Sequence, residues 1–319
     1  MKRSRLLALT LVVCVLAGSV VLASASSVQW PRKPVQIIVP YGAGGDTDFN
    51  ARVLAERLNK VLGGNFVVVN MAGTGGATGA RYVKDSANDG YTVLFHHTGF
   101  LVSKLSGVSD FGLDAYEFVC IAGRSAGNII TLHSKHGITN LKELIEYSQA
   151  NPGKLKIAAN TGATTHATAL MLRDIGAKLN IVDSGGAADR IVALLGGHVD
   201  IIVNPYGTLK DYLETGELVG IALDSDVQPA TIPDIPIGAA QGYDIGLPFY
   251  YFLAFPKGTD PAIVEKLSSA VKEIVANDAS YAETIMNAYL QTPTYYDAEE
   301  GLRLMQEAYE KLSRLDFTN

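Results

Sequence analysis

The chain has 319 residues, of which 48% are hydrophobic and 18% are charged, a composition that is typical of a globular protein and excludes an intrinsically disordered one. This length is about right for two domains. The formal net charge of −6 argues against bulk binding to nucleic acid or to an anionic membrane surface.

The N-terminus has the features of a secretory signal peptide, which we assign to residues 1–25. A basic start, MKRSR, precedes an apolar stretch that ends at Ala23-Ser24-Ala25, a small-residue cleavage site. The apolar stretch is nearly long enough to span a bilayer, so a retained membrane anchor is the alternative. We therefore predict an exported periplasmic protein that is cleaved near Ala25. Cleavage would remove Cys14 and leave Cys120 alone, so no intramolecular disulfide is expected.

Short β-rich runs alternate with helical patterns along the rest of the chain. The first predicted strands are 35–39, 65–69, 91–95 and 118–122, with helices at 49–62 and 77–86. Further strands are predicted at 128–133, 155–160, 180–183, 199–204 and 250–256, with helices at 141–153, 165–177, 189–197, 261–277 and 298–315. This alternation predicts parallel α/β sheets, and its recurrence predicts two α/β lobes of similar build. Cys120 lies in an apolar strand-like run, which favours a buried, unreactive thiol.

The first glycine-rich loop is PYGAGGDTD (40–48), which follows a predicted strand and precedes a helix. Exposed backbone N–H groups and the positive end of a helix dipole make such a loop a ready anion site. Thr47 or Asp48 is the expected N-cap of the helix. The alternative is a plain strand–helix turn with no ligand, since a lone glycine motif is weak evidence.

The second glycine run is AGTGGATGA (72–80), which resembles a dinucleotide-binding fingerprint. Its glycines are spaced G-x-G-x-x-x-G rather than G-x-G-x-x-G, and the next predicted strand ends at His96 rather than at an acid. Both departures argue against a dinucleotide site.

Two later turns also join a strand end to a helix start. ANTGATTHATALM (159–171) offers the hydroxyls of Thr164 and Thr165. His166 is either a ligand contact, a catalytic group, or a packed or capping side chain. In DSGGAADR (183–190), Arg190 is either a bidentate partner of a carboxylate or a solvated surface residue. Several anion-ready turns at strand C-termini together predict a cleft between the lobes that holds an anion with few cationic side chains.

Taken together, these stretches resemble the solute-binding proteins of tripartite tricarboxylate transporters, known as the Bug family. The resemblance covers nearly the whole chain after the signal peptide. It is carried in order by KPVQIIVPYGAGGDTD (33–48), NMAGTGGATGA (70–80), DGYTVLF (89–95), TGATTHATALML (161–172), ALLGGHVDI (193–201) and GLPFYYFLAFPKGTDPAIVEKL (246–267). As a set these motifs are specific, although no single one is.

The resemblance implies a type II periplasmic-binding fold with a hinge and an interlobe ligand cleft. The expected division is a first lobe of residues 26–124 plus 248–319 and a second lobe of residues 125–247. No cofactor, metal or catalytic residue is implied. By position, the ligand contacts would be Tyr41, Gly44, Gly45, Thr47 and Asp48 in the first loop, His97, Thr98 and Gly99 in the second, Gly162, Ala163, Thr164, Thr165 and His166 in the third, and Gly186, Ala187 and Ala188 in the fourth.

The chain departs from the family pattern at three places. Ser184-Gly185-Gly186 stands where the family usually has Tyr-Lys-Gly, Asp46 stands where it often has a third glycine, and His96-His97 is unusual at its site. These differences leave the ligand open among tricarboxylates, dicarboxylates, aromatic acids and amino acids, and Asp46 is compatible with a ligand that bears an amine.

The function implied is that of a monomeric, non-catalytic receptor that captures a small carboxylate by hinge closure and docks on integral-membrane transporter subunits. A sensor that passes the signal to a membrane kinase would bind in the same way and is one alternative. A hydrolase is the other. The sequence has no G-x-S-x-G nucleophile elbow, and Gly137 after His136 argues against a helical pair of metal-binding histidines.

Overall fold

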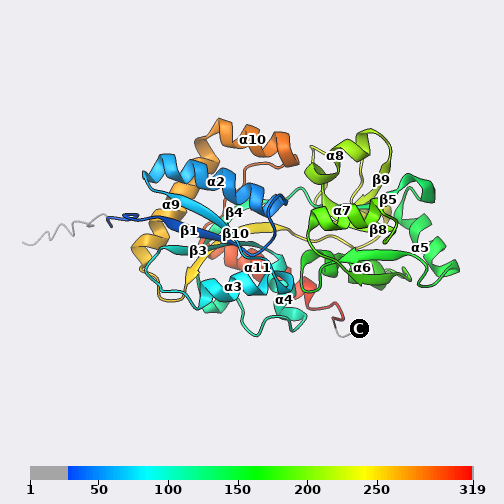
Figure 1. The fold of residues 1–319 in the computed structure, drawn as a ribbon, viewed down its shortest axis with the longest axis horizontal. Coiled ribbons are helices and arrows are strands. Elements are labelled where there is room, and N and C mark those ends of the chain that lie inside the picture. Colours follow the sequence, from blue (N-terminus) through cyan, green and yellow to red (C-terminus); the bar gives the residue numbers. More distant parts are fainter. Residues whose placement is uncertain (1–27, 318–319) are drawn as a thin grey trace, which may run out of the picture.

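The computed structural model of the protein describes residues 28–317, which form two lobes, each built around a five-stranded sheet (Figure 1). This architecture confirms the predicted two-lobe α/β fold. The predicted signal peptide and its cleavage site lie outside the described residues. Within the described part, no helix has the length and apolar character needed to cross a bilayer.

The first lobe contains strands β1 (Val35–Val39), β2 (Phe66–Asn70), β3 (Thr92–His97), β4 (Tyr116–Arg124) and β10 (Tyr250–Pro256) in the order β2-β1-β3-β10-β4. Strand β1 pairs in parallel with β2 and β3, while β10 runs antiparallel to β3 and β4. Four of the five β1 residues are buried, as expected for a parallel strand covered by helices on both faces.

The second lobe repeats this plan with β5 (Asn128–His133), β6 (Lys156–Ala159), β7 (Asn180–Asp183), β8 (Ile201–Pro205) and β9 (Leu218–Leu223) in the order β7-β6-β8-β5-β9. Strand β6 pairs in parallel with β7 and β8, and β5 runs antiparallel to β8 and β9. In each lobe, therefore, one strand (β10 or β5) runs antiparallel to both of its neighbours in the sheet, and the other four strands run in the same direction as one another.

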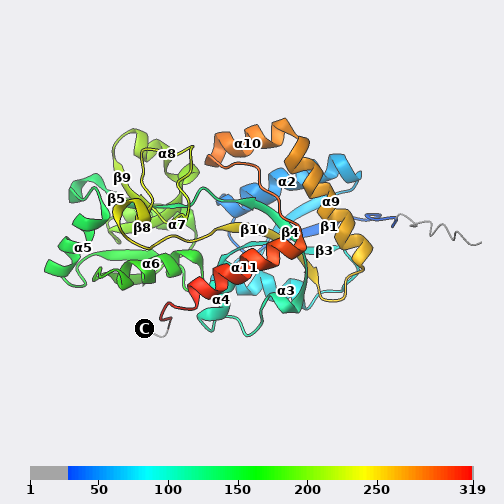
Figure 2. The same ribbon diagram turned by 180° about the vertical axis from the view of Figure 1, so that it is seen from behind.

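Helices cover both faces of each sheet (Figures 1 and 2). In the first lobe, α2 (Asp46–Leu62), α9 (Pro261–Asn277) and α10 (Ala279–Tyr289) lie on one face, and α3 (Ala77–Lys84), α4 (Gly99–Leu105) and α11 (Ala298–Leu312) lie on the other. In the second lobe, α7 (Ala187–Leu195) and α8 (Tyr206–Glu214) lie on one face and α6 (Thr164–Asp174) on the other, with α5 (Leu141–Ala150) at the far end.

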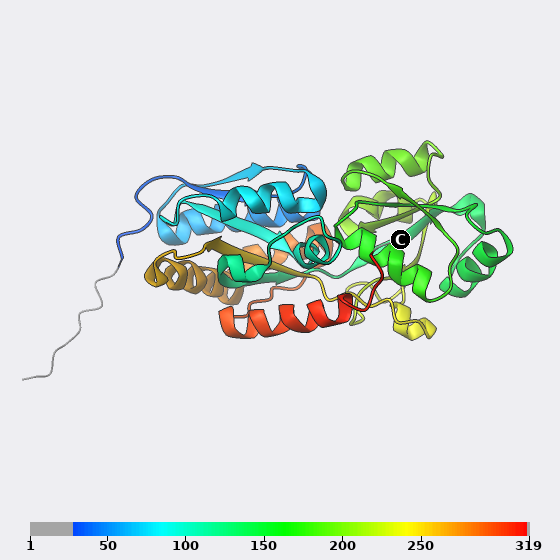
Figure 3. The same ribbon diagram turned by 90° about the horizontal axis from the view of Figure 1, so that it is seen from below.

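The chain crosses between the lobes through residues 125–127, between β4 and β5, and through residues 224–249, between β9 and β10. The three last helices then pack on the first lobe. The tail after α11 reaches the second lobe, where the Phe317 ring lies 5.6 Å from that of His166 (Figure 3). The parallel strands of the two sheets end at the gap between the lobes, which is the edge where α/β folds bind ligands.

The predicted strands and helices are present, with bounds shifted by a few residues. Strand β9 (Leu218–Leu223) and helices α4, α8 and α10 were not predicted from the sequence. Helix α2 begins at Asp46, three residues before its predicted start. Cys120 is fully buried, as predicted, and burial raises the pKa of its thiol.

Candidate functional site

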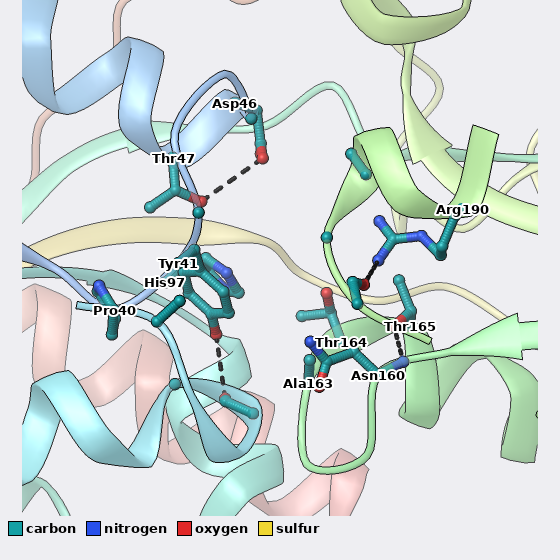
Figure 4. Close-up of a pocket in the computed structure, with 18 of the residues that line it drawn as sticks. Pro40, Tyr41, Asp46, Thr47, His97, Asn160, Ala163, Thr164, Thr165 and Arg190 are labelled. Atoms are coloured by element: carbon teal, nitrogen blue, oxygen red, sulfur yellow. Dashed lines mark hydrogen bonds between the residues drawn. The ribbon is translucent and has the colours of Figure 1, made fainter. Parts of the chain in front are cut away.

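A cavity of 490 Å³ lies between the two lobes and is lined by both (Figure 4). The first lobe contributes the loops that follow β1 and β2, together with His97 at the end of β3. The second lobe contributes the turns that follow β6 and β7, together with Pro205 at the end of β8. The carboxyl ends of six strands, three from each lobe, therefore meet around one space.

Five helices, α2, α3, α6, α7 and α8, begin at this cavity without a side-chain cap on their N-termini. The N-caps of α2, α6 and α7 are Gly45, Ala163 and Gly186, and none of them supplies a side-chain acceptor. Of the helices whose N-caps do not line the cavity, α5, α9, α10 and α11 are capped by an Asn or Asp side chain, and α4 is not. Some N–H groups at the N-termini of α2, α6 and α7 already have acceptors, such as the Gly186 N–H, which donates to Asp189 Oδ2 at 2.8 Å. Others, such as those of Ala187 and Ala188, have no acceptor among the described hydrogen bonds, and the helix dipoles make this position favourable for an anion.

The expected cap on α2 by Thr47 or Asp48 is wrong. The Asp48 carboxylate instead accepts hydrogen bonds from the Gly44 N–H (3.0 Å), Arg52 Nε (3.1 Å) and Asn70 Nδ2 (2.9 Å). These donors tie the loop to α2 and to the end of β2. The positive φ of Gly44 (83°), which favours glycine, closes the turn. Asp48 therefore stabilises the conformation of the loop through these hydrogen bonds and does not itself line the cavity.

Asp46, in the first turn of α2, lines the cavity. The Tyr251 hydroxyl donates to Asp46 Oδ2 at 2.5 Å, and the Gln291 amide donates to that hydroxyl at 3.2 Å. Burial raises the pKa of the Asp46 carboxyl, while the bond from Tyr251 and the charge of Arg190 act in the opposite direction.

Arg190 on α7 is buried at the opposite side of the cavity rather than solvated at the surface (Figure 4). Its Nε donates to Asn204 Oδ1 (2.7 Å) and its Nη1 to the Gly185 carbonyl (2.9 Å). Burial lowers the pKa of Arg190 to about 10, which keeps the guanidinium charged at neutral pH.

The two adjacent histidines are neutral. Burial lowers the pKa of His96 to about 3 and that of His97 well below 6.5. His97 Nδ1 accepts from the Gly99 N–H at 2.9 Å, so the remaining ring proton lies on Nε2. The His97 ring stacks on Tyr41 with centroids 4.6 Å apart, and Phe249 packs nearby at 4.5 Å. His97 thus gives the cavity a neutral aromatic wall rather than a cation.

The glycine run 72–76 lines the cavity and touches the other lobe. A Cβ atom on Gly75 would lie 2.5 Å from the Thr161 carbonyl oxygen, so only glycine permits this approach. The Ser103 hydroxyl on α4 lies 2.9 Å from the Gly75 carbonyl and 2.8 Å from that of Gly162, and so bridges the two lobes.

The cavity brings together ten of the sixteen residues that the resemblance implied as ligand contacts. These are Tyr41, Gly45, Thr47, His97, Ala163, Thr164, Thr165, Gly186, Ala187 and Ala188. The other six do not line it, namely Gly44, Asp48, Thr98, Gly99, Gly162 and His166. Several of these six lie next to the lining and hold it in place through hydrogen bonds. Thr98, for example, accepts from the Tyr250 N–H through its hydroxyl at 3.0 Å.

Other lining residues were not among the sixteen contacts that the resemblance implied, although the sequence had already offered Arg190 as one possible carboxylate partner. They include Asp46, Asn128, Asn160, Arg190, Phe249 and the run 72–76. The run 72–76 could have been found, because it follows a predicted strand end just as the first loop does. Phe249 and Asn128 stand at the crossings between the lobes, for which the sequence carries no local signal. Among residues 28–317, no three His, Cys, Asp or Glu side chains are grouped in a way that could hold a metal ion.

Comparison with known proteins places this geometry in a family. A family model described as "Tripartite tricarboxylate transporter family receptor" matches residues 50–316. Protein BugT of Bordetella pertussis is 31% identical over 287 residues, which cover 88% of this chain and 87% of BugT.

Two solved structures share the fold. The periplasmic binding protein BugD superposes with a TM-score of 0.74 at 27% identity, over 89% of this chain and 97% of BugD. MatC from Rhodopseudomonas palustris, solved with bound malate, superposes with a TM-score of 0.80 at 22% identity, over 89% of this chain and 99% of MatC.

Proposed function

Since the chain belongs to the tripartite tricarboxylate transporter receptors, the Bug family of solute-binding proteins, we propose that it captures a small organic carboxylate in the interlobe cavity and delivers it to membrane transporter subunits. The family is one of solute-binding receptors, and such a role needs no nucleophile or general base. Export to the periplasm, through the predicted signal peptide, is part of this proposal.

One observation carries the proposal. The uncapped N-termini of α2, α6 and α7 come from both lobes and meet at one cavity. A carboxylate placed there would accept hydrogen bonds from main-chain N–H groups of both lobes at once. MatC, whose likeness to this chain shows a shared fold, carries bound malate, so this fold can hold a small carboxylate.

The binding cycle follows from the two lobe crossings. We propose the hinge at residues 125–127 and 224–249, with a first lobe of residues 26–124 plus 248–319 and a second lobe of residues 125–247. A ligand that touches both lobes favours the closed form over the open one, and the closed surface is the form that docks on the membrane subunits. The ten predicted contacts that line the cavity are the proposed ligand shell, and the receptor acts as a monomer.

A thermal-shift screen of organic acids on the protein without residues 1–25 tests the binding step. A ligand at about 100 times its Kd should add about 2.7 kcal/mol to the free energy of unfolding. Titration calorimetry should then give one site per chain. A folded sample that responds to no organic acid would contradict the proposal.

The delivery step needs a separate experiment. The tagged receptor, with and without the best ligand, is incubated with detergent-solubilised membranes, and the captured proteins are identified. We expect multi-span transporter subunits to be enriched when ligand is present. Capture of a sensor kinase instead would contradict delivery while leaving the binding step intact.

A further inference from the structure

The cavity has an acidic side chain on one side and a basic side chain on the other. Asp46 enters from the first lobe and Arg190 from the second, and Figure 4 shows them across the gap from one another. No ion pair joins them among the described salt bridges, although the charge of each stabilises the charged form of the other. The space between them is therefore flanked by a carboxylate and a guanidinium that do not neutralise each other directly.

The Asp46 carboxylate is held in place by buried groups. Tyr251 is fully buried and Gln291 is 3% exposed. Because the Gln291 amide donates to the Tyr251 oxygen, the single hydroxyl proton of Tyr251 is directed to Asp46 Oδ2. The Thr47 hydroxyl lies 3.5 Å from the second oxygen, Oδ1, and the main-chain N–H of Thr47 also hydrogen-bonds to the carboxyl group. The bond from Tyr251 fixes the orientation of the carboxyl group, which lines the cavity and has lone pairs left to accept from a ligand.

Asn128 provides a second acceptor in the lining. Its Nδ2 donates to the buried carboxylate of Asp224 at 3.2 Å, and its main-chain N–H donates to the other oxygen of that group at 2.6 Å. Since a carboxylate accepts hydrogen bonds, the amide nitrogen of Asn128 must face Asp224. The Asn128 side-chain oxygen is then free to accept from a donor in the cavity.

The side that carries Arg190 has the opposite character. Two of the guanidinium nitrogens are engaged with Asn204 and Gly185, while Nη2 has no hydrogen-bond partner among the residues that the structure describes. The uncapped N-termini of α6 and α7 lie on the same side. The Asp189 carboxylate also lines this side, where one of its oxygens accepts from the Gly186 N–H at 2.8 Å. Arg190 and the N–H groups at the N-termini of α6 and α7 are the donors on the second lobe, across from Asp46.

We propose that the cavity takes a zwitterion, a small carboxylate that also carries an ammonium group, such as an amino acid. The carboxylate lies at Arg190 and the N-termini of α6 and α7, and the ammonium donates to Asp46. This assignment rests on the proposed function, because it places the ligand in the same cavity. A ligand with carboxylates at both ends and no ammonium group would set an anion against Asp46, which is unfavourable in a partly desolvated space.

Calorimetry with matched ligand pairs tests the assignment. Each pair differs in one ammonium group: L-glutamate and glutarate, L-aspartate and succinate, 4-aminobutyrate and butyrate. We expect the best-bound pair to show at least a tenfold tighter Kd for the amine-bearing member. The Asp46→Asn variant keeps the size of the side chain and should reduce this preference at least tenfold.

The control is Asp110→Asn, which removes one negative charge at an exposed ion pair with Arg81, outside the cavity. It should leave the preference unchanged. An amine-free acid that binds wild-type protein as tightly as its partner would overturn the zwitterion assignment and preserve the proposed function. Preference retained in Asp46→Asn would overturn the role of Asp46. Failure of every acid, with or without an amine, would overturn both proposals.

Discussion

Closure of the cavity depends on a glycine that no other residue can replace without moving the lobes. Gly75 has φ 60°, and a Cβ atom there would lie 2.5 Å from the Thr161 carbonyl oxygen and 2.9 Å from the Gly162 carbonyl carbon. These are main-chain atoms of the second lobe. Thr161 is itself held by two hydrogen bonds to Asp183 at 2.8 Å, so the loop resists displacement. Gly75→Ala should therefore push the lobes apart.

The cost of the substitution can be estimated from the contacts. Relief of the overlap by lobe separation would break the bridge from the Ser103 hydroxyl to Gly162, worth about 1 kcal/mol. Overpacking of a close contact costs roughly a further 1–3 kcal/mol. The closed form should thus lose about 2–4 kcal/mol relative to the open form, which corresponds to a rise in Kd of about 30- to 1,000-fold.

The assay is calorimetry with the best ligand from the screen, together with small-angle scattering. Wild-type protein should contract when ligand is added, and Gly75→Ala should contract less. Gly63→Ala is the matched control, because Gly63 has nearly the same φ, 63°, but an added Cβ there meets nothing within 4 Å. Wild-type affinity and full contraction in Gly75→Ala would show that the observed approach of the lobes is not needed for binding.

Three further substitutions or treatments test other parts of the structure. The Thr164 hydroxyl lines the cavity and makes no hydrogen bond among the described residues, so Thr164→Val should raise Kd about tenfold and leave the melting temperature of the ligand-free protein unchanged. Thr165→Val should instead lower that melting temperature, because Thr165 Oγ1 accepts from the Asn160 N–H at 2.9 Å. Burial raises the pKa of Asp224 from 3.8 to about 6, so the folded state holds its proton more tightly than the unfolded state, and stability should fall as pH rises through this window. Relative to Asp224→Asn, wild-type protein should lose about 2 kcal/mol between pH 4 and pH 6 in urea titrations, and parallel curves for the two proteins would contradict the assignment. Cys120 is fully buried and burial raises its pKa, so a thiol reagent should label it only after denaturant is added, and rapid labelling of native protein would disprove its burial.

Local features of the fold could be predicted from the sequence because they depend on neighbouring residues. The run VQIIV followed by PYGAGG predicts a buried strand and a glycine turn, and the structure has both. The predictions failed where local signals are weak. Strand β9 and helix α10 are at least as long as the predicted β6 and α6, so length does not explain why they were missed. The apolar faces of β9, α4, α8 and α10 are defined by the parts of the molecule that they contact.

The first loop shows why the site was only partly predictable. Thr47 and Asp48 are good N-cap residue types, yet the helix begins earlier and Gly45 occupies the cap. Asp48 is turned away by donors from Arg52, one helical turn along, and from Asn70, at the end of another strand. The sequence gives no sign that Asn70 would come within 2.9 Å of this carboxylate.

The two α/β lobes, the glycine turns at strand ends and the resemblance to the family could all be read from the sequence, because they depend on local periodicity and on ordered motifs. Which groups share the cavity depends on the packing of distant segments. Tyr251 meets Asp46 across 205 residues of chain, and Gly75 meets Thr161 only because the lobes approach each other. Arg190 is buried rather than solvated for the same reason. Contacts of this kind depend on how whole sheets and lobes pack, and no local pattern of residues specifies that packing.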